Sequence, residues 1–161
     1  MKDINKLNHE NVEVNPVDPL NPINKISGEQ KIFAGFIHFG AMLLALFTSW
    51  FVGFGGMAVA GIAYLVLKND NNSFAREHAK EAFNFNFTMF LITLLACTVG
   101  VVLTVIIAVL TLGIGLFVIV PIAIFIILLM MLLWIVCSVL AGISGFQGKP
   151  YKYPFTWRIL E

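Results

Sequence analysis

The residues of this chain that could do chemistry are few, and most interrupt long stretches without any charge. Polar groups in apolar surroundings are costly to bury, so each one raises the question of a functional role. The candidates are His38, Tyr64, Glu77, His78, Glu81, Asn84, Asn86 and Ser144.

Several of these side chains lie on one face of an expected helix. At 100° per residue they fall within about 60° of one another, and so predict a polar stripe that descends from a charged surface into an apolar run. Asn86 points the opposite way, and His78 lies between the two faces. The stripe consists of Glu77, Glu81, Asn84 and Thr88.

Polar residues of four expected helices also lie at a similar depth. At about 1.5 Å of rise per residue, each is roughly 6 to 10 Å from the nearest cation of its own segment. We therefore expect a hydrogen-bonded layer near one end of the helices. It is either a vestibule open to the cytoplasm that contacts a solute or peptide, with His38 responding to protons, or a set of polar contacts that fix helix packing. We favour the second, because Asn, Ser and His side chains commonly bond across membrane helices. The layer comprises His38, Tyr64, Asn84, Asn86 and Ser144.

A metal site has weak support in this sequence. Glu77, His78 and Glu81 could converge loosely on an ion from positions i, i+1 and i+4 of a helix. Ordinary helix charges paired with Arg76 or Lys80 explain the same pattern. We expect no metal site and no cofactor.

Catalysis has equally little support. Ser138 and His38 are the nearest approach to a nucleophile with a base, and they lie at different depths. Cys97 and Cys137 are far apart and are interpreted as small buried apolar residues. No glycine-rich phosphate loop or pair of buried carboxylates appears. The sequence therefore predicts a protein that is not an enzyme.

Composition places the chain in a membrane. Of its 161 residues, 59% are hydrophobic and 12% are charged, against roughly 25% charged in a typical soluble domain. No charged residue occurs from Ile32 to Leu67 or from Ala82 to Gly148. Each run exceeds the roughly 20 residues of one helical crossing. The formal net charge of +1 argues against a nucleic-acid partner.

Turn signals divide the two apolar runs. Glycines near Trp50–Gly56 and the sequence TLGIG at Thr111–Gly115 are typical of tight reversals. We expect an all-α integral membrane protein, with four transmembrane helices within residues 31–147, at about 31–50, 55–68, 82–110 and 116–146.

Cations predict the orientation. All ten Lys and Arg residues fall on one side of the membrane if there are four spans. Because cytoplasmic loops carry the positive excess, both termini are expected in the cytoplasm. The expected location is the bacterial cytoplasmic (inner) membrane, as a multi-pass protein.

The two ends of the chain differ from its middle. Residues 1–30 are rich in Asn and Pro and are predicted to be a disordered cytoplasmic tail, with no signal peptide or lipid-anchor motif. Residues 148–161 mix aromatic and basic side chains, as interfacial anchors do. The expected anchor residues are Tyr151, Tyr153, Trp157 and Arg158.

Two short motifs carry a family resemblance. The sequence HAKEA-x-NF covers His78–Phe85, and G-x-x-Y-x-Y-P covers Gly148–Pro154. In combination they resemble small bacterial membrane proteins of a Tic-like domain of unknown function, related to the membrane subunit of the chloroplast inner-envelope import translocon. The resemblance covers roughly residues 35–160. It implies four helices with both termini on one side, and carries over little activity.

Taken together, these patterns favour a small non-catalytic membrane protein that acts as a scaffold or as a subunit of a larger membrane complex. The alternative is a channel or transporter-like component that passes a solute or a polypeptide. The expected partners are the lipid bilayer and either an unknown membrane protein or further copies of the chain.

Overall fold

The computed structural model describes residues 26–48, 54–69 and 72–160. Within these ranges the protein contains four α-helices and no strand, so the all-α prediction is confirmed. Most of the predicted tail and the predicted turn around Trp50 lie outside the described residues. The helices are α1 (Gly28–Phe47), α2 (Phe54–Leu67), α3 (Ser73–Leu110) and α4 (Leu116–Phe146).

Local capping sets where two helices begin. The Ser27 hydroxyl accepts the Gln30 amide at 3.2 Å, and the Gln30 side chain accepts the Ser27 amide at 3.1 Å. This reciprocal pair satisfies amides that the first turn of α1 leaves free. Asn72 caps α3 with a single side-chain bond, in which its oxygen accepts the amide of Ala75 at 3.0 Å. α3 then runs without a break from Ser73 to Leu110, so it begins before the predicted start near residue 82.

The helices differ greatly in length. α3 has 38 residues and α4 has 31, which correspond to about 57 Å and 46 Å. α1, with 20 residues, is about 30 Å long, close to the thickness of a bilayer core. These three are long and apolar enough to cross a membrane. α2 has 14 residues and is shorter than a full crossing.

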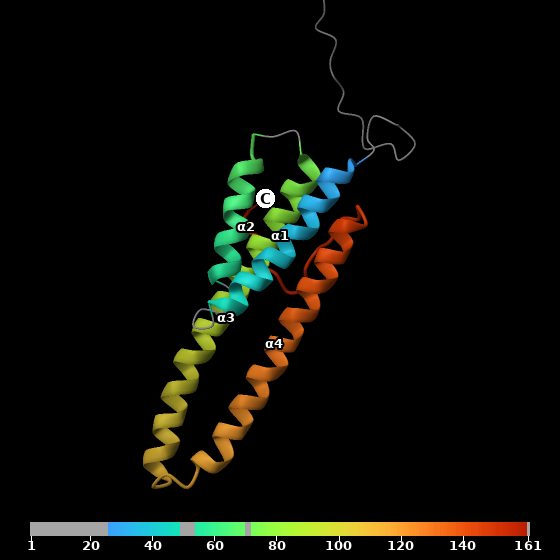
Figure 1. The fold of residues 1–161 in the computed structure, drawn as a ribbon. Helices are drawn as coiled ribbons and strands as arrows, with labels where there is room; N and C mark the ends of the chain where they lie inside the picture. The colour runs from blue at the N-terminus through green and yellow to red at the C-terminus, as the bar shows by residue number, and fades with distance from the viewer. Residues whose placement is uncertain (1–25, 49–53, 70–71, 161) are drawn as a thin grey trace, which may run out of the picture.

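The short helices accompany only part of the long ones. α1 lies beside the first half of α3 and the last half of α4, and α2 packs against α1 and α3 (Figure 1). α3 and α4 continue beyond both short helices to the Thr111–Gly115 turn. The rings of Phe54 and Phe90, with centroids 6.2 Å apart, bring the start of α2 to the middle of α3. The protein therefore has a four-helix part and a two-helix extension.

Small residues allow close packing in the four-helix part. A side-chain carbon added to Gly145 would lie 2.7 Å from the backbone nitrogen of Gly35, so α1 and α4 touch backbone to backbone. The alanines between α1, α2 and α3 are almost fully buried; they include Ala34, Ala60, Ala75, Ala79 and Ala82. Small residues at such contacts are typical of helices packed within membranes.

The outer surface is apolar, most of all along the two-helix extension. Each residue from Ile124 to Leu129 is at least half exposed, so no face of α4 is covered there by the described residues. Cys97, expected to be buried, is exposed on the same extension of α3, whereas Cys137 is buried. An apolar surface on every face needs hydrocarbon or another protein around it. This is the surface of a membrane protein.

Candidate functional site

Two histidines from different helices meet inside the four-helix part. Nε2 of His38 on α1 lies 2.8 Å from Nδ1 of His78 on α3. The other nitrogen of His38 lies 3.0 Å from the hydroxyl of Tyr153, and the other nitrogen of His78 lies 3.1 Å from the carbonyl oxygen of Lys149. Both histidines and Tyr153 are buried. These three contacts join α1 and α3 to the segment after α4.

With both rings neutral, this arrangement permits one set of hydrogen positions. A carbonyl only accepts, so Nε2 of His78 must donate to Lys149, and Nδ1 of His78 must then accept. His38 therefore donates from Nε2, and its Nδ1 accepts from the Tyr153 hydroxyl. The bonds run in one direction from Tyr153 to a backbone carbonyl, and every ring nitrogen is satisfied.

The polar stripe of α3 binds the backbone of the C-terminal segment, residues 148–160. The Asn84 side-chain oxygen accepts the amides of Ile159 at 3.1 Å and Leu160 at 3.0 Å. Its nitrogen donates to the carbonyl of Leu160 at 3.0 Å. Asn84 is buried, and this one side chain satisfies three backbone groups of the segment. It thereby fixes the end of the segment against α3.

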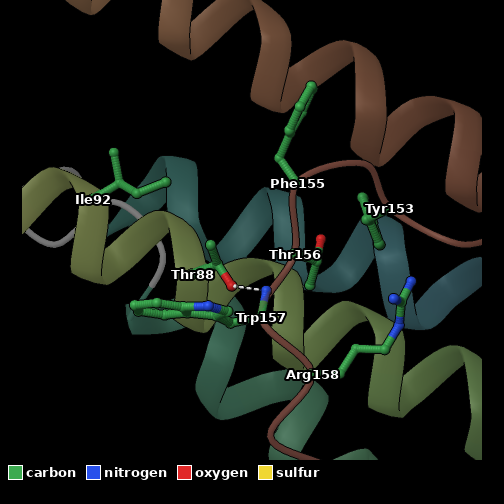
Figure 2. Close-up of a pocket in the computed structure, with 7 residues that line it drawn as sticks. All are labelled: Thr88, Ile92, Tyr153, Phe155, Thr156, Trp157 and Arg158. Atoms are coloured by element: carbon green, nitrogen blue, oxygen red, sulfur yellow. Dashed lines mark hydrogen bonds between the residues drawn. The ribbon is translucent and has the colours of Figure 1, made fainter.

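Two neighbours of Asn84 hold the same segment. One Glu81 carboxylate oxygen accepts the amide of Tyr153 at 3.2 Å, and the other accepts from Nε of Arg158 at 3.2 Å. The Thr88 hydroxyl accepts the amide of Trp157 at 2.9 Å, as Figure 2 shows. Glu81, Asn84 and Thr88 are three of the four residues that helical spacing places on one face; the fourth, Glu77, pairs with Lys80 instead. The structure gives that face a partner within the same chain.

Asn86 lies on the other side of α3 and serves packing. Its side chain donates to the carbonyl of Ala82 at 2.8 Å and accepts from the indole of Trp134 on α4 at 3.3 Å. Sequence reasoning missed Trp134. An indole in the middle of an uncharged run needs an acceptor when it is buried, and this need was the available signal.

The remaining candidate residues form no hydrogen bond with the histidine pair. Tyr64 packs as a partly buried ring against the alanine cluster. Ser144 is half-buried near the end of α4, where its carbonyl accepts the amide of Lys149. Glu77 is exposed and pairs with Lys80 at 3.0 Å. A functional role for the layer stays a prediction.

The predicted interfacial anchor divides into two kinds of residue. Tyr153, expected along the lipid headgroups, is buried because its ring stacks on Phe85, with centroids 3.9 Å apart, and its hydroxyl reaches His38. Tyr151 is half-buried beside it. Trp157 and Arg158 are exposed, and their role as interfacial anchors stays a prediction.

Burial controls the ionisation of the two tyrosines in this segment. It raises the pKa of the Tyr153 phenol well above its ordinary value, although a hydrogen bond with Ser138 acts in the opposite direction. It also raises the pKa of Tyr151, with a further contribution from Cys137. Both phenols therefore stay neutral and act as hydrogen-bonding groups.

The chemistry of the site is that of a closed network. Among the described residues, no buried side-chain nitrogen or oxygen lacks a hydrogen-bond partner. The same part of the chain contains no group of three or more His, Cys, Asp or Glu residues that could hold a metal ion. The arrangement can join helices and fix the C-terminal segment.

Comparison with known proteins corrects the family expected from the two short motifs. No curated protein and no solved structure matches the chain. The family whose sequence profile matches residues 29–160 is MamF_MmsF, the magnetosome magnetite crystal formation protein family, so the Tic-like assignment and its translocon relationship are wrong. The motif residues His78, Asn84 and Tyr153 form buried hydrogen bonds within the chain. In this protein the two motifs therefore reflect how the helices and the C-terminal segment pack. Because the profile covers most of its length, the chain belongs to the magnetosome magnetite crystal formation protein family.

Proposed function

We propose that this chain is a non-catalytic membrane scaffold, which supports magnetite crystal formation as a subunit of a larger assembly in the magnetosome membrane. The family supplies the process and the compartment. The distribution of polar groups along the protein supplies the argument for a scaffold.

Charged groups of the described residues gather at one end of the protein. The Lys31 side chain lies beside Gly148, and a nitrogen of Arg76 donates to the carbonyl of Lys68, so the start of α1, the end of α4 and the α2–α3 connection share that end. Because cations are enriched on the cytoplasmic face of membrane proteins, we assign this end, and with it both termini, to the cytoplasm. The Thr111–Gly115 turn then faces the opposite side, toward the crystal.

The turn is poorly suited to contact a mineral. Iron in proteins is bound mainly by carboxylate, imidazole and thiolate groups, whereas this turn contains none of them. Its one side-chain hydroxyl, that of Thr111, donates to the carbonyl of Ile107 at 2.6 Å and accepts the amide of Gly115 at 2.9 Å. This absence of ligands is the observation that carries the proposal. The chain acts on crystals by organising other components.

A scaffold is also favoured over a conduit. Each buried polar side chain of the described residues has a hydrogen-bond partner in the chain, and these groups lie in the four-helix part. Along the two-helix extension, the hydroxyls of Thr98 and Thr104 donate to carbonyls of their own helix. A conduit needs polar groups that are free to replace the water around a solute. The exposed apolar faces instead suit contact with a membrane partner or a further copy.

The test uses a magnetite-forming bacterium that carries this gene. Deletion is expected to change crystal size or number, measured by electron microscopy, and the wild-type gene is expected to restore both. Thr111→Ala, which removes the hydroxyl of the turn, is expected to restore them equally well at matched protein abundance. Crystals unaffected by deletion would contradict the proposed role. Failure of Thr111→Ala at normal abundance would show that the function depends on this turn, which the hydroxyl holds in place, and would count against a role carried by the apolar faces alone.

A further inference from the structure

An open groove of about 490 Å³ lies between the C-terminal segment and α3 (Figure 2). In the figure the segment crosses in front of α3, with Phe155 pointing toward α4 and Trp157 lying next to Thr88. The groove is lined by Thr88, Ile92, Tyr153, Phe155, Thr156, Trp157 and Arg158.

The charge pattern places the basic end of this groove at an edge of the hydrocarbon layer. Arg158 pairs with Glu81, the last charged residue of α3 before its uncharged run. Ile92, which also lines the groove, follows Glu81 by 11 residues and lies roughly 16 Å further along the helix, within that run. The groove therefore extends from the level of the headgroups into that of the acyl chains. This step requires only that α3 crosses the membrane, and is independent of any role in crystal formation.

The groove has an apolar end and a basic end. Ile92 is 40% exposed and leads to further exposed apolar residues of α3, among them Leu95 and Val99. At the other end, the Arg158 side chain is 47% exposed. Its Nε donates to Glu81, and its two terminal nitrogens have no hydrogen-bond partner among the described residues. A guanidinium held in this way presents a planar pair of donors that suits a phosphate.

Two of the three aromatic residues that line the groove face outward without cover from the described residues. Phe155 is 93% exposed and Trp157 is 68% exposed. Phe155 also has a φ of +54°, in the left-handed region that non-glycine residues rarely adopt. Strain of this kind persists where the surroundings or a ligand stabilise it, and exposed aromatic rings are typical of the membrane interface.

We propose that this groove binds one anionic phospholipid, with its phosphate on the Arg158 guanidinium and an acyl chain along Ile92 and Trp157. The occupant follows from the position and the chemistry. The groove opens to the layer where lipids are the neighbouring molecules. It combines the two terminal nitrogens of Arg158 with an apolar surface that continues along α3. The C-terminal segment is thereby a lipid-binding element as well as a structural one.

The first test is native mass spectrometry of the full chain, purified in detergent and supplied with phosphatidylglycerol or phosphatidylcholine. The wild type is expected to retain phosphatidylglycerol about fivefold better, the effect of one basic residue near anionic lipid. Arg158→Gln is expected to lose this preference. Lys152→Gln is the matched control, because Lys152 is an exposed cation of the same segment that does not line the groove.

The second test follows the indole of Trp157 in vesicles that contain brominated acyl chains. The emission of Trp157 is taken as the difference in fluorescence between the wild type and Trp157→Phe. Brominated phosphatidylglycerol is expected to quench this emission more strongly than brominated phosphatidylcholine does. Added inorganic phosphate is expected to leave the quenching unchanged. Equal quenching by the two lipids would overturn the proposal. It would also fail if Lys152→Gln lost as much preference as Arg158→Gln, or if phosphate alone displaced the lipid. None of these outcomes bears on the crystal-formation role.

Discussion

Nε2 of His38 and Nδ1 of His78 lie 2.8 Å apart, although 40 residues separate them in the chain. This contact joins the first helix to the start of the third. Through Tyr153 and the Lys149 carbonyl, the same bonds reach the segment that follows the fourth helix. One buried pair thus connects α1, α3 and the segment after α4.

The bond shared by His38 and Tyr153 predicts that the costs of removing them are not additive. His38→Leu leaves Nδ1 of His78 unpaired, while the Tyr153 hydroxyl keeps Ser138; Tyr153→Phe leaves Nδ1 of His38 unpaired and takes from Ser138 its Tyr153 partner. Each buried unpaired group costs about 1–3 kcal/mol, so each variant is expected to lower the free energy of unfolding by at least that amount. The double variant should cost about 1–2 kcal/mol less than the sum of the two. Unfolding in detergent micelles measures all three, and additive losses would contradict the network.

Helical spacing could predict the stripe and the layer, and could not predict what they bind. Glu81, Asn84 and Thr88 share a face because 3.6 residues make a turn, a purely local property. Their partners are backbone amides about 70 residues later, and no periodicity encodes the return of an irregular segment. Tyr153 was expected at the surface because aromatic and basic neighbours are typical of interfaces. Its buried position depends on His38, on a different helix.

The bonds of Asn84 make the C-terminal segment separable from the bundle. Asn84→Ala removes three hydrogen bonds to the backbone of Ile159 and Leu160. At about 0.5–1.5 kcal/mol for each, the segment should open tenfold more often or more. Limited trypsin digestion in micelles is expected to cut faster after Lys152 and Arg158. Asn86→Ala, which leaves the segment contacts in place, serves as the control, and equal acceleration in both variants would indicate general loosening.

Two glycines provide a matched test of helix packing. An added side-chain carbon at Gly145 would meet the backbone nitrogen of Gly35 at 2.7 Å, and one at Gly100 would meet nothing within 4 Å. Gly145→Ala must separate α1 from α4 and is expected to cost about 1–3 kcal/mol. Gly100→Ala is expected to be neutral or to stabilise α3 by up to about 1 kcal/mol, because alanine favours helix. Thermal unfolding in micelles should separate the two variants, and similar melting temperatures would contradict the backbone contact.

The buried phenol of Tyr153 predicts how stability depends on alkaline pH. Burial raises the pKa of Tyr153 in the folded protein, while the unfolded chain releases the proton near the ordinary value of about 10. Below about pH 10 the stabilising contribution is fully present. As the pH rises further, the unfolded state binds fewer protons than the folded state, so the free energy of unfolding falls.

Tyr153→Phe should therefore be less stable at neutral pH, where the His38 bond is lost, and should show a shallower fall above about pH 10. Tyr151→Phe is the comparison, since burial raises the pKa of that phenol as well and it accounts for part of the same fall. Chemical unfolding in micelles between about pH 8 and pH 11 gives the slopes, which straddle the ordinary phenol pKa. Equal slopes for wild type and Tyr153→Phe would mean that the phenol is hydrated in the folded protein, and would remove Tyr153 from the buried network.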